Sequence, residues 1–187
     1  MNATERARVI TEKLCLEYPD RRPLLNYRSP FELIIAVILS AQTTDAQVNE
    51  VTPELFGRYP GPPDLAAAKV EDVEAIVHST GFYRHKARNV IGAARVICER
   101  FAGEVPQAMD DLVSIPGVGR KSANVIRGVV FALPAIVVDT HLTRVSNRLG
   151  FVQGKNPTAI ERNLQAIVPE EIQTDFSMTL NLHGRFC

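Results

Sequence analysis

Apolar residues recur three and four positions apart along most of this chain of 187 residues. That spacing places them on one face of an α-helix. The clearest such stripe runs from Ala87 to Phe101 and ends before Gly103. Only residues 135–138 (Ala-Ile-Val-Val) suggest a strand, but no second run could pair with them, so we expect a buried extended connector there. The pattern predicts an all-α protein.

Capping signals and chain-breaking residues divide the pattern into separate helices. Ser29, Pro30 and Glu32 combine a capping box with a proline at the first helical position, and they predict a buried helix over 31–39. Glycine or proline ends several of the other apolar stripes. The remaining predicted helices cover or start at 7–14, 44 or 45, 73–77, 87–101, 109–114, 120–131, 142–149 and 160–167.

The formal net charge of the chain is zero, because 21 basic residues balance 21 acidic ones. This balance argues mildly against indiscriminate nucleic-acid binding, although local clustering matters more than the sum. A local basic cluster does exist, and two readings of it stay open: a phosphate-facing stripe, or an ordinary solvated helix surface. Its members are Arg84, His85, Lys86, Arg88, Arg120, Lys121 and Arg127.

Targeting and redox signals are absent from the sequence. The N-terminus has no basic segment followed by an apolar stretch, and the longest apolar run, Leu33–Leu39, is too short to span a bilayer. Three cysteines, Cys15, Cys98 and Cys187, cannot build a disulfide framework. We therefore expect a monomer in a reducing cytoplasm, associated with a bacterial or archaeal nucleoid.

Residues 112–124 (LVSIPGVGRKSAN) carry the chemical signal of the sequence. Two predicted helices meet there through a Pro-Gly-Val-Gly turn, whose glycines allow a tight turn and a close approach of the backbone to a ligand. The free N–H groups at the start of the second helix favour an anion such as a DNA phosphate. A nucleotide-binding P-loop is excluded, because Ile115 and Arg120 stand where it needs glycines and a helix precedes the turn.

Lys121 and Asp139 are the candidate catalytic pair. At a helix N-terminus, beside Arg120 and partly desolvated, the Lys121 ammonium is disfavoured and the nucleophilic amine becomes accessible. A carboxylate at Asp139 could accept the proton of this amine and stabilise positive charge on a sugar. The alternatives are a lysine that only contacts phosphate, and an aspartate that only caps a helix.

The same hairpin resembles the helix-hairpin-helix of DNA repair glycosylases. Three further segments resemble the endonuclease III family in order and spacing: 137–150 (VVDTHLTRVSNRLG), 39–45 (LSAQTTD) and 182–185 (LHGR). The resemblance implies a two-lobed helix-hairpin-helix glycosylase fold with the active site in the cleft between lobes. One lobe would span 22–134, with the hairpin at about 109–131, and the other would join 1–21 to 135–187.

The resemblance implies a base excision repair enzyme acting on damaged bases or abasic sites in double-stranded DNA. It would be a bifunctional DNA glycosylase and apurinic/apyrimidinic lyase that removes oxidised pyrimidines through a Schiff base on Lys121 and then nicks the strand. Two alternatives stay open at this point: a non-catalytic helix-hairpin-helix DNA-binding module, and a monofunctional glycosylase. The presence of Lys121 argues against the monofunctional enzyme, because the related adenine glycosylases lack that lysine.

The resemblance also assigns DNA contacts. Gln42 would enter the gap left by the extruded base, and Phe82 would be a second wedge, although a turn-solvating glutamine and a core phenylalanine are the plain alternatives. For His141 and Arg144 a structural role is the stronger reading. The full set of predicted DNA-binding residues is Gln42, Phe82, Arg84, Gly117, Val118, Gly119, Arg120, His141 and Arg144.

Cys187 departs from the family pattern. Family members hold a [4Fe–4S] cluster on four cysteines in a short C-terminal loop, and such a cluster needs four thiolates. Cys187 resembles the first of these cysteines and is the sole candidate ligand in the sequence. We therefore expect a chain shortened at the start of the iron–sulfur loop, unable to ligate the cluster by itself.

Overall fold

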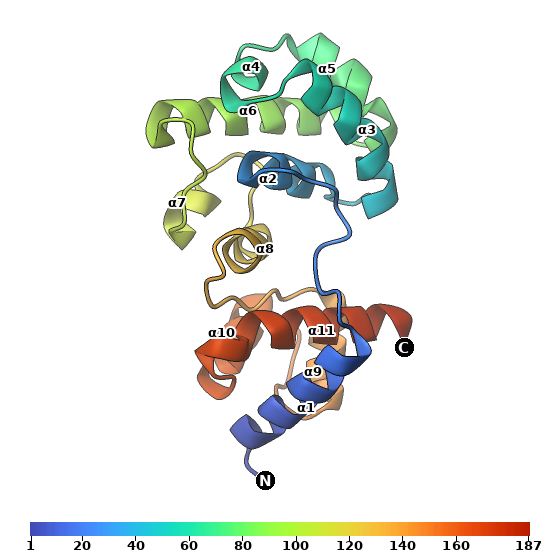
Figure 1. Ribbon diagram of the computed structural model, residues 1–187, viewed down its shortest axis with the longest axis vertical. Coiled ribbons are helices and arrows are strands. Elements are labelled where there is room, and N and C mark those ends of the chain that lie inside the picture. The colour runs from blue at the N-terminus through green and yellow to red at the C-terminus, as the bar shows by residue number, and fades with distance from the viewer. The chain divides into compact units, whose positions relative to one another are not determined.

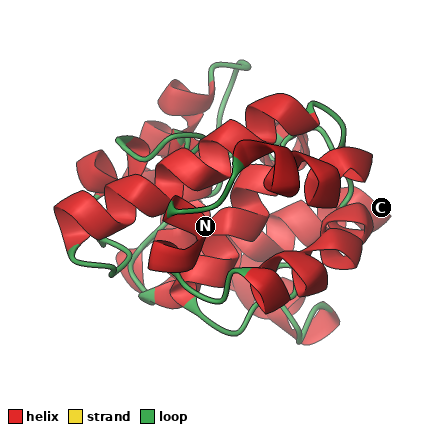
Figure 2. Cartoon of the chain, turned by 90° about the horizontal axis from the view of Figure 1, so that it is seen from above, coloured by secondary structure: helices red, strands yellow, loops and turns green.

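The computed structural model describes every residue from Met1 to Cys187 and contains only helices and loops (Figure 2). This confirms the predicted all-α class. None of the helices combines the length and the apolar character that crossing a bilayer requires. The helices are α1 (Ala3–Glu17), α2 (Pro30–Leu39), α3 (Asp45–Arg58), α4 (Pro62–Ala66), α5 (Val70–Val77), η1 (His78–Thr80), α6 (Tyr83–Phe101), α7 (Met109–Val113), α8 (Arg120–Val130), α9 (Thr140–Arg148), α10 (Pro157–Ile167), η2 (Glu170–Ile172) and α11 (Gln173–Phe186).

The chain divides into two compact units. The terminal unit joins Met1–Arg22 to Arg127–Cys187, and the central unit is Pro23–Ile126. The second boundary thus falls inside α8, whereas the sequence placed it at residue 134. The last turns of α8 belong to the terminal unit because they pack closely there: a Cβ added at Gly128 would lie 2.9 Å from the Thr174 side chain.

Helix α2 forms the core of the central unit. Every residue from Phe31 to Leu39 is buried, and α6 packs with α2 and also with α4 and α5 (Figure 1). The predicted start of α2 is correct, since the Ser29 hydroxyl accepts a hydrogen bond from the Glu32 N–H at 3.1 Å. The predicted capping box is only half formed, because the Glu32 carboxylate turns to Arg28 instead. It accepts from the Arg28 backbone N–H at 2.7 Å and pairs with the guanidinium at 2.9 Å, which offsets its burial.

Helices α1, α9, α10 and α11 build the terminal unit around one apolar core (Figure 1). Phe151 and Phe176 meet edge to face inside it, with ring centroids 5.5 Å apart. The segment Ala135–Val138 is buried and belongs to no helix or strand, which confirms the predicted extended connector. It delivers the chain from α8 to Asp139 through the core, so the position of Asp139 is tightly fixed.

Candidate active site

The predicted hairpin is present in the central unit as α7, a turn, and the start of α8. In the turn the Val118 N–H donates to the Ile115 carbonyl at 3.0 Å, and both side chains are buried. Gly117 adopts a φ of 82°, a left-handed conformation that favours glycine. A Cβ at Gly117 would lie 2.8 Å from Cγ2 of Ile38, so the turn also packs directly on α2. Backbone conformation and packing both require glycine at this position.

Gly119, the second glycine of the turn, has a different environment. No atom lies within 4 Å of the place where its Cβ would stand. The first helical hydrogen bond of α8 runs from the Ala123 N–H to the Gly119 carbonyl at 2.9 Å. The N–H groups before Ala123 therefore have no acceptor within the helix, as at any helix start. The sequence predicted that a ligand could approach the backbone closely at both glycines. Of the two, only Gly119 has the free space for such an approach.

Lys121 lies in the first turn of α8 with its side chain exposed. The expectation of a partly desolvated amine is wrong for the free protein. A ligand that covers the side chain would exclude water from this nitrogen, so bound DNA can complete an environment that activates the amine.

Asp139 is the N-cap of α9 in the terminal unit and is half-buried. Its Oδ1 accepts from the Leu142 backbone N–H at 2.8 Å, and its Oδ2 accepts from the side-chain amide of Asn181 on α11. Capping is therefore real, and it leaves further lone pairs on both oxygens for a ligand. The two donors fix the plane and the direction of the carboxylate.

Asn181 was not identified from the sequence. It is separated from Asp139 by 42 residues, belongs to no recognised motif, and is only 9% exposed. A buried asparagine aimed at a carboxylate becomes visible only when α9 and α11 are seen side by side. Nothing in the periodicity of the sequence marks it.

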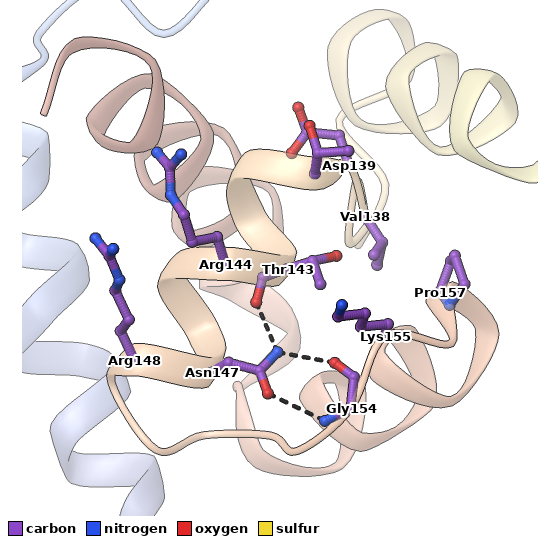
Figure 3. Close-up of a pocket in the computed structure, with 10 residues that line it drawn as sticks. Val138, Asp139, Thr143, Arg144, Asn147, Arg148, Gly154, Lys155 and Pro157 are labelled. Carbon is purple, nitrogen blue, oxygen red and sulfur yellow. Dashed lines mark hydrogen bonds between the residues drawn. The ribbon is translucent and has the colours of Figure 1, made fainter.

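A cavity of about 810 Å³ opens beside Asp139 within the terminal unit (Figure 3). Arg144, Arg148 and Lys155 contribute to its lining, and all three are exposed. Arg148 and Lys155 were not among the predicted site residues. Figure 3 shows the Arg144 and Arg148 guanidinium groups on one side of α9 and Lys155 on the other, so the three cations flank the helix of the acidic candidate catalyst and do not converge on one point.

Asn147 holds the loop that carries Lys155. Its amide nitrogen donates to the Thr143 carbonyl at 2.7 Å and to the Gly154 carbonyl at 2.9 Å, and its oxygen accepts from the Gly154 N–H at 3.0 Å (Figure 3). These three bonds fasten the loop to α9. Lys155 therefore follows directly on a fixed backbone.

His141 and Arg144 share one acceptor. Nδ1 of His141 donates to the Gly184 carbonyl at 2.9 Å, and the Arg144 guanidinium donates to the same oxygen. A Cβ at Gly184 would lie 2.9 Å from the Cβ of His141, so α9 and α11 are in close contact here. Both side chains thus fasten α9 to α11, which is the structural role that the sequence favoured for them.

Gln42 and Phe82 lie on two loops of the central unit that the structure brings together. Both side chains are exposed, Phe82 by 68%, so the alternative reading of Phe82 as a core residue is wrong. Both residues have positive φ, 53° at Gln42 and 49° at Phe82, which is uncommon for a residue with a Cβ. The hydroxyl of Thr43, next to Gln42, donates to the carbonyl of Thr80 at 2.8 Å and joins the two loops.

The basic cluster at the start of α6 is exposed at three of its four positions. Arg84, His85 and Arg88 face solvent, and the Arg84 guanidinium lies 5.6 Å from the centre of the Tyr83 ring. Lys86 is buried, with an exposure of 3%. The prediction of a phosphate-facing role is therefore wrong for Lys86, because its ammonium is directed into the protein.

The residues present do not fit an iron–sulfur cluster. A [4Fe–4S] cluster needs four thiolates, and no group of three or more His, Cys, Asp or Glu side chains lies close enough together to hold a metal ion. Cys187 is exposed, and its sulfur lies 3.8 Å from the Tyr18 hydroxyl. Cys15 and Cys98 are half-buried in helices.

Comparison with known proteins gives relatives that match most or all of this chain. The HhH-GPD superfamily base excision DNA repair protein family matches residues 35–170. Endonuclease III of Synechocystis sp. is 47% identical over 169 residues, which cover 90% of this chain and 77% of that protein. Endonuclease III of Escherichia coli (strain K12) is 42% identical over 186 residues, which cover 100% of this chain and 88% of that protein.

Solved structures give the same result. A trapped endonuclease III–DNA covalent intermediate matches with a TM-score of 0.91 and 42% identity, covering 100% of this chain and 88% of that chain. A thermostable thymine-DNA glycosylase matches with a TM-score of 0.84 at 22% identity, covering 99% of this chain and 89% of that chain, and shares the fold alone. The match to the trapped intermediate covers the whole chain and so includes every candidate residue described above, whereas Asn181 and Cys187 lie outside the span of the family match.

Proposed function

This chain belongs to the endonuclease III family of base excision DNA repair glycosylases and lyases, and we propose that it removes oxidised pyrimidines from duplex DNA through a covalent bond to Lys121. The observation that carries the proposal is the match over the whole chain to an endonuclease III trapped as a covalent intermediate with DNA. A covalent intermediate needs a nucleophile. Lys121 supplies an exposed primary amine at the start of α8, directly after the hairpin turn.

The first chemical step forms a carbon–nitrogen bond and breaks another. The lone pair of the neutral Lys121 amine attacks C1′ of the damaged nucleotide, and the base leaves with the electrons of its glycosidic bond. The attacking nitrogen loses a proton, and the departing base gains one from solvent. The nitrogen lone pair then forms a double bond to C1′ as the C1′–O4′ bond breaks and O4′ takes up a proton, which opens the sugar ring and gives a Schiff base between Nζ and C1′.

The second step cuts the strand. The Schiff base withdraws electrons from C2′, so a proton on that carbon becomes acidic and can be removed by a base. The electrons left at C2′ form a double bond to C3′ and expel the phosphate on the 3′ side. Hydrolysis of the Schiff base then returns Lys121 to its free amine.

Asp139 is proposed to act on the first step. Its carboxylate accepts the proton released by the attacking amine and stabilises the positive charge that develops on the sugar. The Leu142 N–H and the Asn181 amide hold that carboxylate in one orientation, so little reorganisation is needed when the charge appears. The proposal requires Asp139 and Lys121 to address the same deoxyribose.

The remaining candidate residues are proposed to hold and deform the DNA. The backbone at Gly119 and the start of α8 would receive a phosphate, and the exposed Arg84 and Arg120 would attract the strand. Gln42 and Phe82 would fill the space left by the extruded base, since flipping costs a few kcal/mol of stacking and pairing. Val118 would contribute its backbone only, because its side chain is buried.

The family usually carries a [4Fe–4S] cluster, but no step proposed here runs through it, because residues 1–187 do not supply its four thiolates. We place the activity in the cytoplasm, where bacterial relatives would meet chromosomal DNA.

The proposal is tested by trapping the intermediate. Duplex DNA with a single abasic site is incubated with the protein and borohydride, which reduces a Schiff base to a stable amine. We expect a covalent adduct that is lost in Lys121→Ala and kept in Lys69→Ala, which removes an exposed lysine of the same unit. Binding without an adduct would leave a DNA-binding module. A second duplex that carries an oxidised pyrimidine identifies the remaining alternative, because base release without nicking would leave a monofunctional glycosylase.

A further inference from the structure

Lys86 is a buried lysine without an acidic partner. Its side chain is 3% exposed, and its Nζ donates to the backbone carbonyl of Thr80 at 2.7 Å. Burial lowers its pKa, and no carboxylate contributes to the shift. A buried ammonium is costly, and a methionine would fill the same length of space without that cost. The hydrogen bond to Thr80 is the one thing that the ammonium adds.

The bond falls on the loop that carries Phe82. The Lys86 backbone N–H donates to the Phe82 carbonyl at 3.1 Å, while its side chain reaches back to Thr80. A single residue thus holds the loop on both sides of Gly81 and Phe82. Gly81 also has positive φ, 68°, so two consecutive residues of this loop have positive φ.

The same Thr80 carbonyl receives a second bond from the other wedge loop. The Thr43 hydroxyl donates to it at 2.8 Å, and Thr43 follows Gln42 directly. A carbonyl oxygen has two lone pairs, and here each is directed to a different loop or helix. Phe82 is therefore linked to the loop of Gln42 by three hydrogen bonds: from the Lys86 N–H to Phe82, from the Lys86 ammonium to Thr80, and from the Thr43 hydroxyl to Thr80.

Strained backbone persists only where its surroundings hold it. Gln42 and Phe82 are non-glycine residues with positive φ, and both side chains are exposed, so their own packing does not hold them. Backbone hydrogen bonds hold each loop locally, from the Thr43 N–H to the Ser40 carbonyl at 3.2 Å and from the Lys86 N–H to the Phe82 carbonyl at 3.1 Å. The Thr43 hydroxyl and the Lys86 ammonium add the link between the loops through the Thr80 carbonyl. Without these two side-chain bonds the loops are no longer tied to one another, so the two exposed side chains can take new directions.

We propose that Lys86 and Thr43 are positioning residues that lock Gln42 and Phe82 into one preformed wedge through the shared Thr80 carbonyl. The inference rests on the proposed function, because it takes Gln42 and Phe82 as the side chains that enter the DNA. Lys86 and Thr43 act on extrusion of the damaged base, and neither touches the reacting atoms. A preformed wedge enters the duplex without first ordering two loops.

The test separates base extrusion from chemistry. Single-turnover excision of an oxidised pyrimidine is measured when the base is correctly paired, and again when it stands opposite a mismatched base, where extrusion costs least. Lys86→Met keeps the length of the side chain and removes the ammonium, and Thr43→Val keeps the shape and removes the hydroxyl. We expect each change to slow excision of the paired base about tenfold or more, with the mismatched base slowed less than about threefold.

Lys69→Met is the matched control, because it makes the same change at an exposed lysine of the same unit, and we expect it to leave both rates unchanged. An independent readout uses 2-aminopurine beside the lesion in a Lys121→Ala background, where the rise in fluorescence on binding reports unstacking. We expect that rise to shrink when Lys86→Met or Thr43→Val is added.

Equal loss on paired and mismatched substrates, or an unchanged fluorescence rise, would overturn the inference and leave Lys86 a purely structural residue. If Lys86→Met fails to fold, the half-exposed Thr43→Val decides alone, because it breaks the link between the loops without opening the core. An unaltered protein that excises neither base would instead sink the proposed function, so the two failures are distinguishable.

Discussion

Replacing Gly117 by alanine should destabilise the central unit, whereas replacing Gly119 should not. The two glycines stand two residues apart in the same turn and differ in both conformation and surroundings. Gly117 has a φ of 82°, and its added Cβ would approach Ile38 Cγ2 to 2.8 Å. Gly119 has no such φ and no atom within 4 Å of its added Cβ. Comparing Gly117→Ala with Gly119→Ala therefore separates the effect of packing and backbone strain from the effect of replacing any glycine of this turn.

The magnitude follows from two contributions at Gly117→Ala. A non-glycine residue in the left-handed region costs about 1–2 kcal/mol. An overpacked methyl group costs about 1–3 kcal/mol, because Ile38 is buried in α2 and cannot move aside freely. Together they predict a loss of about 2–5 kcal/mol in the free energy of unfolding. For Gly119→Ala we expect a change within about 0.5 kcal/mol, as for an open surface position.

Urea unfolding followed by circular dichroism measures the difference, and thermal unfolding should agree at about 2–4 °C per kcal/mol for a chain of this size. DNA binding should be affected the other way round: among the variants that fold, Gly119→Ala is the one expected to bind DNA more weakly. A methyl group at Gly119 stands where a phosphate would approach the backbone, so Gly119→Ala should weaken binding to abasic-site DNA at unchanged stability. Equal stability of the two variants would refute the described packing of the hairpin on α2.

Two further predictions concern the terminal unit. Asn181→Leu removes the side-chain donor to Asp139 but leaves the hydrogen bond from the Leu142 N–H. We expect single-turnover base excision to slow about ten- to a hundredfold, because a hydrogen bond to a charged group contributes about 1.5–3 kcal/mol. An unchanged rate would mean that Asp139 needs no second donor. Arg148→Ala and Lys155→Ala should each weaken binding to duplex DNA, measured by fluorescence anisotropy. Each change should also lower the slope of log affinity against log salt concentration by about one. A slope equal to that of the unaltered protein would place the side chain away from phosphate.

Local signals predicted most of the helices, and their failures have physical causes. Helix α6 has an uninterrupted apolar stripe, and its predicted range 87–101 lies within Tyr83–Phe101. Helix α11 was not predicted, because polar residues interrupt the apolar ones on its buried face. Those buried polar residues are Gln173, Ser177, Thr179 and Asn181. Ser177 and Thr179 are satisfied by backbone carbonyls, a solution that no hydrophobic pattern reveals. Helix α4 was missed because five residues are too few for periodicity.

Some residues of the candidate site could likewise be predicted from local sequence signals, and others could not. The hairpin turn, the position of Lys121 at the start of α8 and the N-cap at Asp139 follow from residues that are neighbours in the sequence. Asn181 and Lys86 could not be found that way, because their roles depend on contacts made in the folded structure, with Asp139 and Thr80 respectively. Lys86 was even misread, because a lysine among Arg84, His85 and Arg88 gives no sign that it points inward.

The backbone gives a reason to separate Phe82 from other strained positions. Four non-glycine residues have positive φ, and two of them lie just after a helix: Ala102 directly follows α6, and Ala132 stands two residues after the end of α8. Left-handed residues are ordinary at helix ends, and alanine is small, so these two need no functional explanation. Phe82 stands at the start of a helix, where the chain requires no such conformation, and its large ring is 68% exposed. Glycine or asparagine would meet the same backbone geometry with less strain, and an exposed ring gains nothing from folding. The strain and the exposure at Phe82 are therefore best explained by a ligand that the ring enters.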